Sequence, residues 1–339
     1  MKNNLKTHGF FKIPIVQYLI FGAVLCLFQL GLQFGVFTSS FVFAVGNTII
    51  YAIVGIGFCL LLGYSGLASL GTAGFIGIGV YISYYMMEQF GLSFGLAFAA
   101  TVAVSLCLGV MVGFISLRIE GIYLAILTLG LAEILRNLFI SLRSTVKINL
   151  DTLKLFGVQV GETQMYFVIV GVFILLLWIT SNLISSPIGR AMLSIKNSTS
   201  AAQAMGVSLL KYRLMAFVIS TVYAAIAGLL YMMYIRTMTS STSTLLTITT
   251  SLNILGAVII GGAKSLWGTT FGVFIIYGLQ SMFLSKIPFF VKNPAFITMI
   301  TGLFIILIVM FFPGGIAQMV SDFGRFLKKK RLEKGGSGA

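Results

Sequence analysis

Charge is scarce in this chain, and acidic charge is almost missing. Only 9% of the residues are charged, and just 7 of the 339 are Asp or Glu, whereas soluble domains average about 25% charged residues. Hydrophobic residues make up 58% of the sequence, which is more apolar surface than a soluble fold of this length can bury in one core. The composition excludes an ordinary soluble protein and predicts a membrane protein.

Side chains suited to catalysis or metal binding are few and scattered. The single histidine, His8, lies in the N-terminal tail, and the three cysteines, Cys26, Cys59 and Cys107, lie inside apolar stretches without metal-ligand spacing. No Ser/His/Asp grouping and no phosphate-binding Gly-Lys-Ser/Thr string can be assembled. We expect no catalytic residue, no metal site and no cofactor bound by this chain, which is therefore not expected to be an enzyme.

Positive charge is in excess, with 22 Lys and Arg residues and a formal net charge of +15. In membrane proteins basic residues gather in the cytoplasmic segments. No basic patch adjoins a soluble domain, so nucleic acid is not an expected partner. Placing the N-terminus inside puts most of the basic residues on the cytoplasmic side. We therefore expect a multi-pass protein of the bacterial inner membrane, with both termini cytoplasmic and an even number of crossings.

Long apolar runs are abundant, many of them near the roughly 20 residues that cross a bilayer as a helix. Runs such as Phe167–Trp178 are apolar on every face, which favours helices over a transmembrane barrel. The expected fold class is all-α, a polytopic membrane protein with about ten transmembrane helices, some short or broken. The expected spans are 14–37, 41–62, 72–87, 93–117, 122–140, 165–186, 214–234, 251–263, 267–284 and 295–313.

The domain organisation follows from these spans. Residues 1–333 are expected to form a single transmembrane domain, and 334–339 are interpreted as a tail or an artificial linker. The short spans 72–87 and 251–263 are flanked by Gly-rich turns, so each is either a full crossing or a broken helix. A Gly-x-x-Ser-Leu string begins at both Gly66 and Gly262, either through internal duplication or by chance.

Two segments outside the spans are sizeable, an external loop at 141–164 and a cytoplasmic loop at 187–213. In the second loop, Asn197, Ser198 and Thr199 are of types that cap helix N-termini, and they precede an Ala-rich run. Gly206 follows that run, where a helix end favours positive φ. The pattern predicts two short helices along the inner face of the membrane. By itself it leaves open an ordinary interfacial anchor.

The loop string GRAMLSIKNSTSAAQAMGV resembles the coupling loop of permeases in ATP-binding cassette (ABC) importers, where an Ala-Ala pair precedes a Gly. Permeases of this kind usually have an acidic residue before that pair, whereas this chain has Ser200. Further segments resemble the branched-chain amino acid type of these permeases, and they follow the family's order along the chain. These segments are 57–81, 118–138, 251–272 and 311–318.

The resemblance implies a channel-forming permease subunit that translocates branched-chain or related amino acids. Its implied partners are a second, homologous permease subunit, two cytoplasmic ATPases that bind ATP and Mg²⁺, an extracytoplasmic solute-binding protein and the lipid bilayer. The implied coupling residues are Gly189, Arg190, Lys196, Ala201, Ala202 and Gly206. Sugar or nucleoside transport by the same architecture is an alternative. A self-contained secondary carrier is another, although the proton-relay acids that it would need are missing.

Polar residues at Gly-rich breaks, or on otherwise apolar helices, are candidates for lining a translocation path. Each of them could equally make a hydrogen bond between packed helices. Glu133 and Arg136 are spaced i, i+3 and can pair on one helix face, either as path lining or as a structural ion pair. The path candidates are Asn47, Thr48, Tyr64, Ser65, Ser69, Thr72, Thr128 and Glu133.

Overall fold

The computed structural model describes residues 14–319 apart from 34, 36, 117–120, 149–153, 156–157, 160, 241–242, 283–286, 288–289, 291–293 and 312–313. Six described helices are long and apolar enough to cross a membrane, because each offers a run of about 18 residues or more with few charges. These helices are α1 (Pro14–Gln33), α2 (Ser39–Phe58), α4 (Phe94–Ser116), α5 (Ile122–Leu142), α6 (Glu162–Ser185) and α9 (Leu209–Ile235).

Shorter elements complete the described structure. The helices are α3 (Thr72–Tyr84), α7 (Pro187–Asn197), α8 (Thr199–Ala204), α10 (Ile248–Gly261), α11 (Leu266–Val273), α12 (Leu279–Met282) and α14 (Pro294–Phe311). The π-helical turns are η2 (Cys59–Tyr64), η3 (Tyr85–Gln89) and η6 (Phe274–Gly278), and a 3₁₀ turn is η5 (Thr244–Leu246). Two strand pairs are antiparallel: β1 (Thr145–Lys147) with β4 (Thr237–Thr239), and β2 (Lys154–Leu155) with β3 (Val158–Gln159).

The all-α membrane fold expected from the sequence is confirmed. Each of the ten expected spans coincides with a helix or with a run of successive helices. The short spans 72–87 and 251–263 correspond to α3 and α10, of 13 and 14 residues, shorter than the roughly 20 residues of a full crossing. The count of about ten full crossings is not confirmed and stays a prediction.

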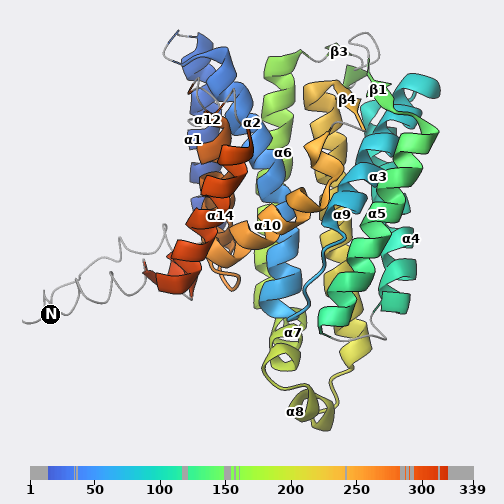
Figure 1. The fold of residues 1–339 in the computed structure, drawn as a ribbon, viewed down its shortest axis with the longest axis vertical. Helices are drawn as coiled ribbons and strands as arrows, with labels where there is room; N and C mark the ends of the chain where they lie inside the picture. The colour runs from blue at the N-terminus through green and yellow to red at the C-terminus, as the bar shows by residue number, and fades with distance from the viewer. Residues whose placement is uncertain are drawn as a thin grey trace, which may run out of the picture.

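The helices stand side by side in one bundle (Figure 1). The helices α7 and α8 project from one end, called here the α7–α8 end, and the strand pairs lie at the opposite end. The helices α1 and α14 lie on one side of the bundle, and α4 and α5 on the other. The bundle therefore has two distinct ends, one of them carrying the loop 187–213.

The helices α2, α3 and α9 form the centre of the bundle. In the apolar stretch of α2, 89% of the residues are buried, against 22% in each of α1, α4 and α5. A Cβ added to Gly79 would overlap the carbonyl oxygen of Ala225, and one added to Gly228 would overlap that of Ile76. These glycines let the backbones of α3 and α9 touch, which is how membrane helices gain packing contacts.

Two breaks in the helices meet near the α7–α8 end. The first follows Tyr64, where Gly66 has a φ of 74°, and the second follows α10, where Gly262 has a φ of 100°. The two Gly-x-x-Ser-Leu strings thus both mark breaks. The Tyr64 hydroxyl donates to the carbonyl of Lys264 over 3.0 Å, and the Cys59 thiol donates to that of Ala263 over 3.1 Å. These bonds join the end of α2 to the turn between α10 and α11.

Candidate functional site

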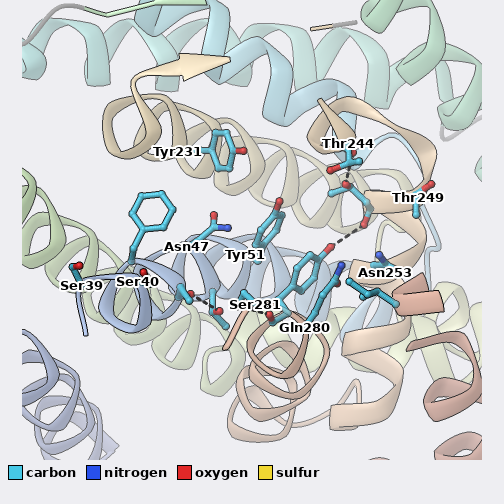
Figure 2. A pocket seen from close by; sticks show the side chains of 16 residues that line it. Ser39, Ser40, Asn47, Tyr51, Tyr231, Thr244, Thr249, Asn253, Gln280 and Ser281 are labelled. Atoms are coloured by element: carbon cyan, nitrogen blue, oxygen red, sulfur yellow. Dashed lines mark hydrogen bonds between the residues drawn. The ribbon is translucent and has the colours of Figure 1, made fainter. Parts of the chain in front are cut away.

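A polar cavity of about 860 Å³ lies between the helices, away from the α7–α8 end (Figure 2). The first half of α2 forms one wall, and α9, the start of α10, η6 and α12 contribute the others. None of the lining side chains is that of an Asp, Glu, Lys, Arg or His. The lining residues are Ser39, Ser40, Phe43, Ala44, Asn47, Thr48, Tyr51, Tyr231, Thr244, Thr249, Thr250, Asn253, Tyr277, Gln280, Ser281 and Ile297.

The cavity combines hydroxyl and amide groups with aromatic rings. Hydroxyls and carboxamides can donate and accept hydrogen bonds without bringing a net charge into the membrane. Aromatic rings supply apolar surface beside these polar groups. The cavity is therefore suited to a small molecule that has both polar groups and an apolar part.

Two stacked tyrosines link α2 to η6 at the cavity wall. The ring centroids of Tyr51 and Tyr277 are 3.9 Å apart and their planes differ by 12°. The Tyr277 hydroxyl donates to the carbonyl of Thr250 over 3.3 Å, and the Thr250 hydroxyl donates to that of Thr244 over 2.7 Å. The first turns of α10 are thus tied to the tyrosine pair.

Neighbouring residues Asn47 and Thr48 use their polar atoms differently. The Thr48 hydroxyl donates to the carbonyl of Ala44 over 2.8 Å, within its own helix. The side-chain oxygen of Asn47 is buried and has no hydrogen-bond partner in the structure. Because buried polar atoms are normally paired, this oxygen is the one that a water or a solute in the cavity would satisfy.

Asn47 and Thr48 were predicted from the sequence to line a path, and both line the cavity. The other lining residues, Asn253 and Gln280 among them, were not predicted. The carboxamides of Asn253 and Gln280 lie within the apolar spans 251–263 and 267–284, which is the same signal that singled out Asn47. A carboxamide side chain within an apolar span was therefore a pattern that could have identified Asn253 and Gln280 from the sequence.

The other path candidates lie elsewhere, mostly at the break before α3. Ser65, Ser69 and Thr72 are buried along this break. The Thr128 hydroxyl, on α5, accepts a hydrogen bond from the backbone N–H of Leu70 over 3.0 Å. These residues and Tyr64 are not among those lining the cavity. Their part in a path stays a prediction.

Glu133 lies on α5 and outside the cavity lining. Its carboxylate accepts a hydrogen bond from the guanidinium of Arg136 over 2.9 Å, so the ion pair suggested by the i, i+3 spacing forms. The Glu133 side chain is 48% exposed and that of Arg136 is 26% exposed. A charged side chain at the centre of a membrane helix costs at least about 2.5–3.5 kcal/mol on insertion scales. Such side chains therefore face protein or water rather than lipid.

The first helix of the loop 187–213 is anchored by specific contacts. Pro187 occupies the first turn of α7, and the Ser186 hydroxyl accepts from the backbone N–H of Ile188 over 3.2 Å, an N-terminal cap. A Cβ on Gly189 would overlap the carbonyl of Ile184. The guanidinium of Arg190 is exposed and donates to the carbonyl of Ser185 over 3.1 Å.

The second helix, α8, is the outermost element at its end of the bundle (Figure 1). The Ser198 hydroxyl caps it by accepting from the N–H of Ala201 over 3.3 Å. Gly206 has a φ of 79°, its N–H donates to Gln203, and the next N–H donates to Ala202. This is the Schellman arrangement of a helix C-terminus, so the two short helices and the positive φ are confirmed.

The faces of α8 differ in exposure. Ala202 is buried against the bundle, whereas Ala201 is exposed. Met205 is 83% exposed at the tip.

Lys196, at the end of α7, is directed into the bundle. Its ammonium donates to the carbonyls of Leu62 and Gly63 over 3.0 and 2.8 Å. These carbonyls belong to the last turn of η2, where helix carbonyls lack partners and favour a cation. Partial burial and the nearby Lys264 ammonium lower the pKa of Lys196 from its ordinary value.

A second hollow, of about 620 Å³, lies between α1 and α6. Its lining is mainly apolar, and the polar groups of its side chains are those of Tyr18, Cys26 and Trp178. On the outer surface of a membrane bundle, acyl chains fill such grooves. The polar cavity is therefore the better candidate for a site.

The structure is that of a polytopic membrane protein, with an uncharged polar cavity between its helices and a capped two-helix loop at one end. Residues 40–311 match the family described as "Branched-chain amino acid transport system / permease component". This match covers well over half of the chain, so the chain belongs to that family.

Two curated relatives are similar to this chain. One is the high-affinity branched-chain amino acid transport system permease protein LivM of Salmonella typhimurium, 32% identical over 54% of this chain and 50% of the relative. The other is LivM of Escherichia coli, 29% identical over the same shares. The chain thus aligns with about half the length of the curated relatives. No solved structure matches it.

Proposed function

We propose that this chain is the membrane-spanning permease subunit of an ABC importer for branched-chain or related amino acids. In the proposed assembly it pairs with a second permease subunit, two ATPases supply ATP hydrolysis, and an extracytoplasmic binding protein delivers the solute. The α7–α8 end faces the cytoplasm of a bacterium, with the chain in its inner membrane and both termini inside.

The observation that carries this proposal is the uncharged polar cavity, lined by Asn47, Tyr51, Asn253 and Gln280 among others. A zwitterionic amino acid with an apolar side chain needs hydrogen bonds at one end and apolar surface at the other. A cavity without fixed charges can release such a solute readily, which favours passage over tight binding. Selectivity then belongs to the binding protein.

The loop 187–213 supports coupling to an ATPase. The helix α8 projects from the bundle and presents Ala201, Met205 and Gly206 to its surroundings. A short rigid helix with small residues can enter a groove on a partner closely. In this proposal, closure of the ATPases moves α7 and α8, and the cavity alternates between the two sides of the membrane.

The test is to isolate the chain from its native membrane in mild detergent and to identify what accompanies it by mass spectrometry. We expect two ATPase subunits and a second permease. Reconstitution of that complex with its binding protein in liposomes should then give ATP-dependent uptake of labelled leucine, isoleucine or valine.

Two results would overturn the proposal. Isolation of the chain alone under several detergents, with gradient-driven uptake by the chain alone, would make it a secondary carrier. Recovery of the complex with uptake of sugars or nucleosides but not amino acids would keep the class and replace the substrate. A variant with a bulky residue in place of Gly206, which is expected to block uptake, controls for leakage of the labelled solute into the liposomes.

A further inference from the structure

The stacked pair of Tyr51 and Tyr277 lies at the inner limit of the polar cavity. Along α2 the lining residues stop at Tyr51, and along the helical run of α11, η6 and α12 they begin only at Tyr277. None of the described residues of α2 beyond Tyr51, and none of α11, lines the cavity. Along these two elements the cavity therefore ends at the tyrosine pair, on the side of the α7–α8 end.

The two elements stay in contact beyond the tyrosine pair, along a line named here the α2–α11 seam. A Cβ added to Gly55 would lie 2.8 Å from a methyl carbon of Val273, and the Cys59 thiol lies beside the Thr269 hydroxyl. The partners run in opposite directions, so the helices are antiparallel. The layers of the seam, from the cavity toward the α7–α8 end, are Tyr51 with Tyr277, Gly55 with Val273, Cys59 with Thr269, and Tyr64 with Lys264.

Polar groups are buried within the α2–α11 seam. The Thr269 side chain is fully buried, and its position beside the Cys59 thiol does not have hydrogen-bond geometry. Its hydroxyl oxygen has no hydrogen-bond partner among the described residues. Because buried polar atoms are normally paired, this oxygen indicates a second arrangement of the seam, in which water or a solute reaches it.

The contact of α11 with α2 differs from its contact with α10. A Cβ on Gly272 would overlap the carbonyl oxygen of Ala257, so α10 and α11 touch through their backbones. Toward α2, the atom nearest to Gly55 is the end of the Val273 side chain. Close backbone contact through glycine holds two helices together, whereas side-chain contacts permit helices to slide and separate. The seam is therefore the side on which α11 can part from its neighbour.

Both ends of the α2–α11 seam carry features suited to movement. Tyr277 belongs to the π-helical turn η6, and such turns occur frequently at functional sites. At the other end, a Cβ on Gly63 would overlap the carbonyl of Ala263, so backbone contact closes the seam there. The Lys196 ammonium of α7 holds the carbonyls of Leu62 and Gly63. A displacement of α7 therefore acts directly on the closed end.

We propose that the α2–α11 seam is the inward half of the solute path, and that the stack of Tyr51 on Tyr277 is the gate between it and the cavity. When the stack separates, the Cys59 thiol and the Thr269 hydroxyl line the passage that opens. The inference rests on the proposed function, which supplies the solute and the ATP-driven movement of α7. It requires the seam to open in every transport cycle, which fixed structural packing would not.

The first experiment locks the seam with a disulfide between Gly55→Cys and Val273→Cys, in a chain whose native cysteines are replaced with Ala. Only one atom of Val273, a methyl carbon, lies within 4 Å of a Cβ on Gly55. The two Cβ atoms are therefore about 4 Å apart, which suits a disulfide. The matched control is Gly22→Cys with Ile174→Cys, because a Cβ on Gly22 would lie 2.9 Å from the branched side chain of Ile174, between α1 and α6.

Uptake of labelled leucine is then measured in the reconstituted complex with its binding protein. We expect oxidation of the seam pair to reduce ATP-driven uptake at least tenfold, and dithiothreitol to restore it. The oxidised control pair should take up leucine within about twofold of its reduced form. Recovery of uptake on reduction shows that the seam variant is folded, and mass spectrometry of proteolytic fragments verifies both disulfides.

The second experiment uses the native Cys59 thiol as a reporter, with Cys26 and Cys107 replaced by Ala. Cys59 is fully buried, so a charged methanethiosulfonate reagent should label it slowly in the resting complex. We expect labelling to become at least tenfold faster when ATP, Mg²⁺ and leucine-loaded binding protein are supplied together.

Removal of one tyrosine of the gate should expose the same thiol without ATP. We expect Tyr277→Ala to label at Cys59 at least fivefold faster than wild type in the resting state. The matched control is Phe139→Ala, which removes a similar stack, that of Tyr81 on Phe139 with centroids 4.5 Å apart, away from the seam. It should label at the wild-type rate.

Several outcomes would overturn the proposal. Equal uptake by the oxidised seam and control pairs would do so, and so would a Cys59 thiol that stays protected during ATP-driven uptake. If wild type takes up leucine while these tests fail, the gate is wrong and the proposed function stands. If wild type shows no ATP-driven uptake, the proposed function fails. Labelling in the resting state still tests the gate in that case, and equal rates in Tyr277→Ala and Phe139→Ala would reject it.

Discussion

The ammonium of Lys196 and the carbonyl oxygen of Gly63 are joined by a hydrogen bond of 2.8 Å. This contact connects α7 of the loop to the last turn of the helix that begins at Ser39 and runs through Tyr64. The other half of that helix carries Asn47 and Tyr51 at the cavity. A displacement of α7 therefore acts on the element that forms a cavity wall.

Replacing Lys196 with Met should weaken this connection. The substitution removes two hydrogen bonds to carbonyls of the η2 turn, and we expect the free energy of unfolding to fall by about 1–2 kcal/mol, since the site is only partly buried. Uptake per ATP hydrolysed should fall in the reconstituted complex. Thermal unfolding and paired uptake and ATPase assays measure the two effects.

The matched control for Lys196 is Lys211→Met. Lys211 is exposed at the start of α9, and its loss changes the net charge by the same amount. Identical uptake, ATPase activity and unfolding in the two variants would show that the contact with Gly63 has no role in coupling.

Two substitutions of Gly206 should separate the effect of backbone strain from the effect of adding a side chain. Its φ of 79° disfavours a β-branched residue by about 1–2 kcal/mol, so Gly206→Val should disrupt the Schellman turn and reduce ATP-driven uptake at least tenfold. Gly206→Asn should retain most uptake, because Asn tolerates this conformation. Membrane insertion should be normal in both. Equal uptake by the Val and Asn variants would contradict a role for this turn.

Asn47 and Thr48 make a matched pair within the cavity. Asn47→Leu removes an unpaired buried oxygen, so we expect unchanged or higher stability and a clear loss of uptake. Thr48→Val removes a hydroxyl that donates to the carbonyl of Ala44 within its own helix, and it should leave uptake within about twofold. A larger loss in Thr48→Val than in Asn47→Leu would argue against Asn47 as a solute contact.

One added methyl group should have opposite effects at two glycines. At Gly228 it would overlap the carbonyl of Ile76, whereas at Gly171 it meets nothing within 4 Å. We expect Gly228→Ala to destabilise the protein by about 1–3 kcal/mol through overpacking. Gly171→Ala should stabilise it by about 0.5–1 kcal/mol, because Ala favours the helix. Denaturation of both variants in the same detergent measures the difference, and a stable Gly228→Ala would contradict the close approach of α3 and α9.

Local features of the fold were predictable from the sequence, and their causes are local. Pro187, Ser198 and Gly206 act through capping and backbone conformation within a few residues, so the two loop helices followed from residue types alone. The i, i+3 spacing likewise indicated the pairing of Glu133 with Arg136. Apolar run length located every expected span.

Features that depend on contacts between distant segments were not predictable. The cavity brings Asn47 together with Asn253 and Gln280, which lie more than 200 positions further along the chain. The direction of the Lys196 side chain depends on where the η2 turn ends. Helix hydropathy is nearly uniform around most of these spans, so it does not tell which face meets the bundle and which meets lipid. The outward direction of Glu133 therefore emerged only from the packing of α5.

The absence of charged side chains from the cavity lining determines how the membrane potential acts on transport. Moving one elementary charge across a membrane potential involves about 2.3 kcal/mol per 100 mV, but a zwitterion carries no net charge. Since none of the residues lining the cavity is ionic, no fixed charge of the cavity wall shifts through the field with it. Under the proposed function the voltage does no net work on the solute, and its uphill movement is electroneutral.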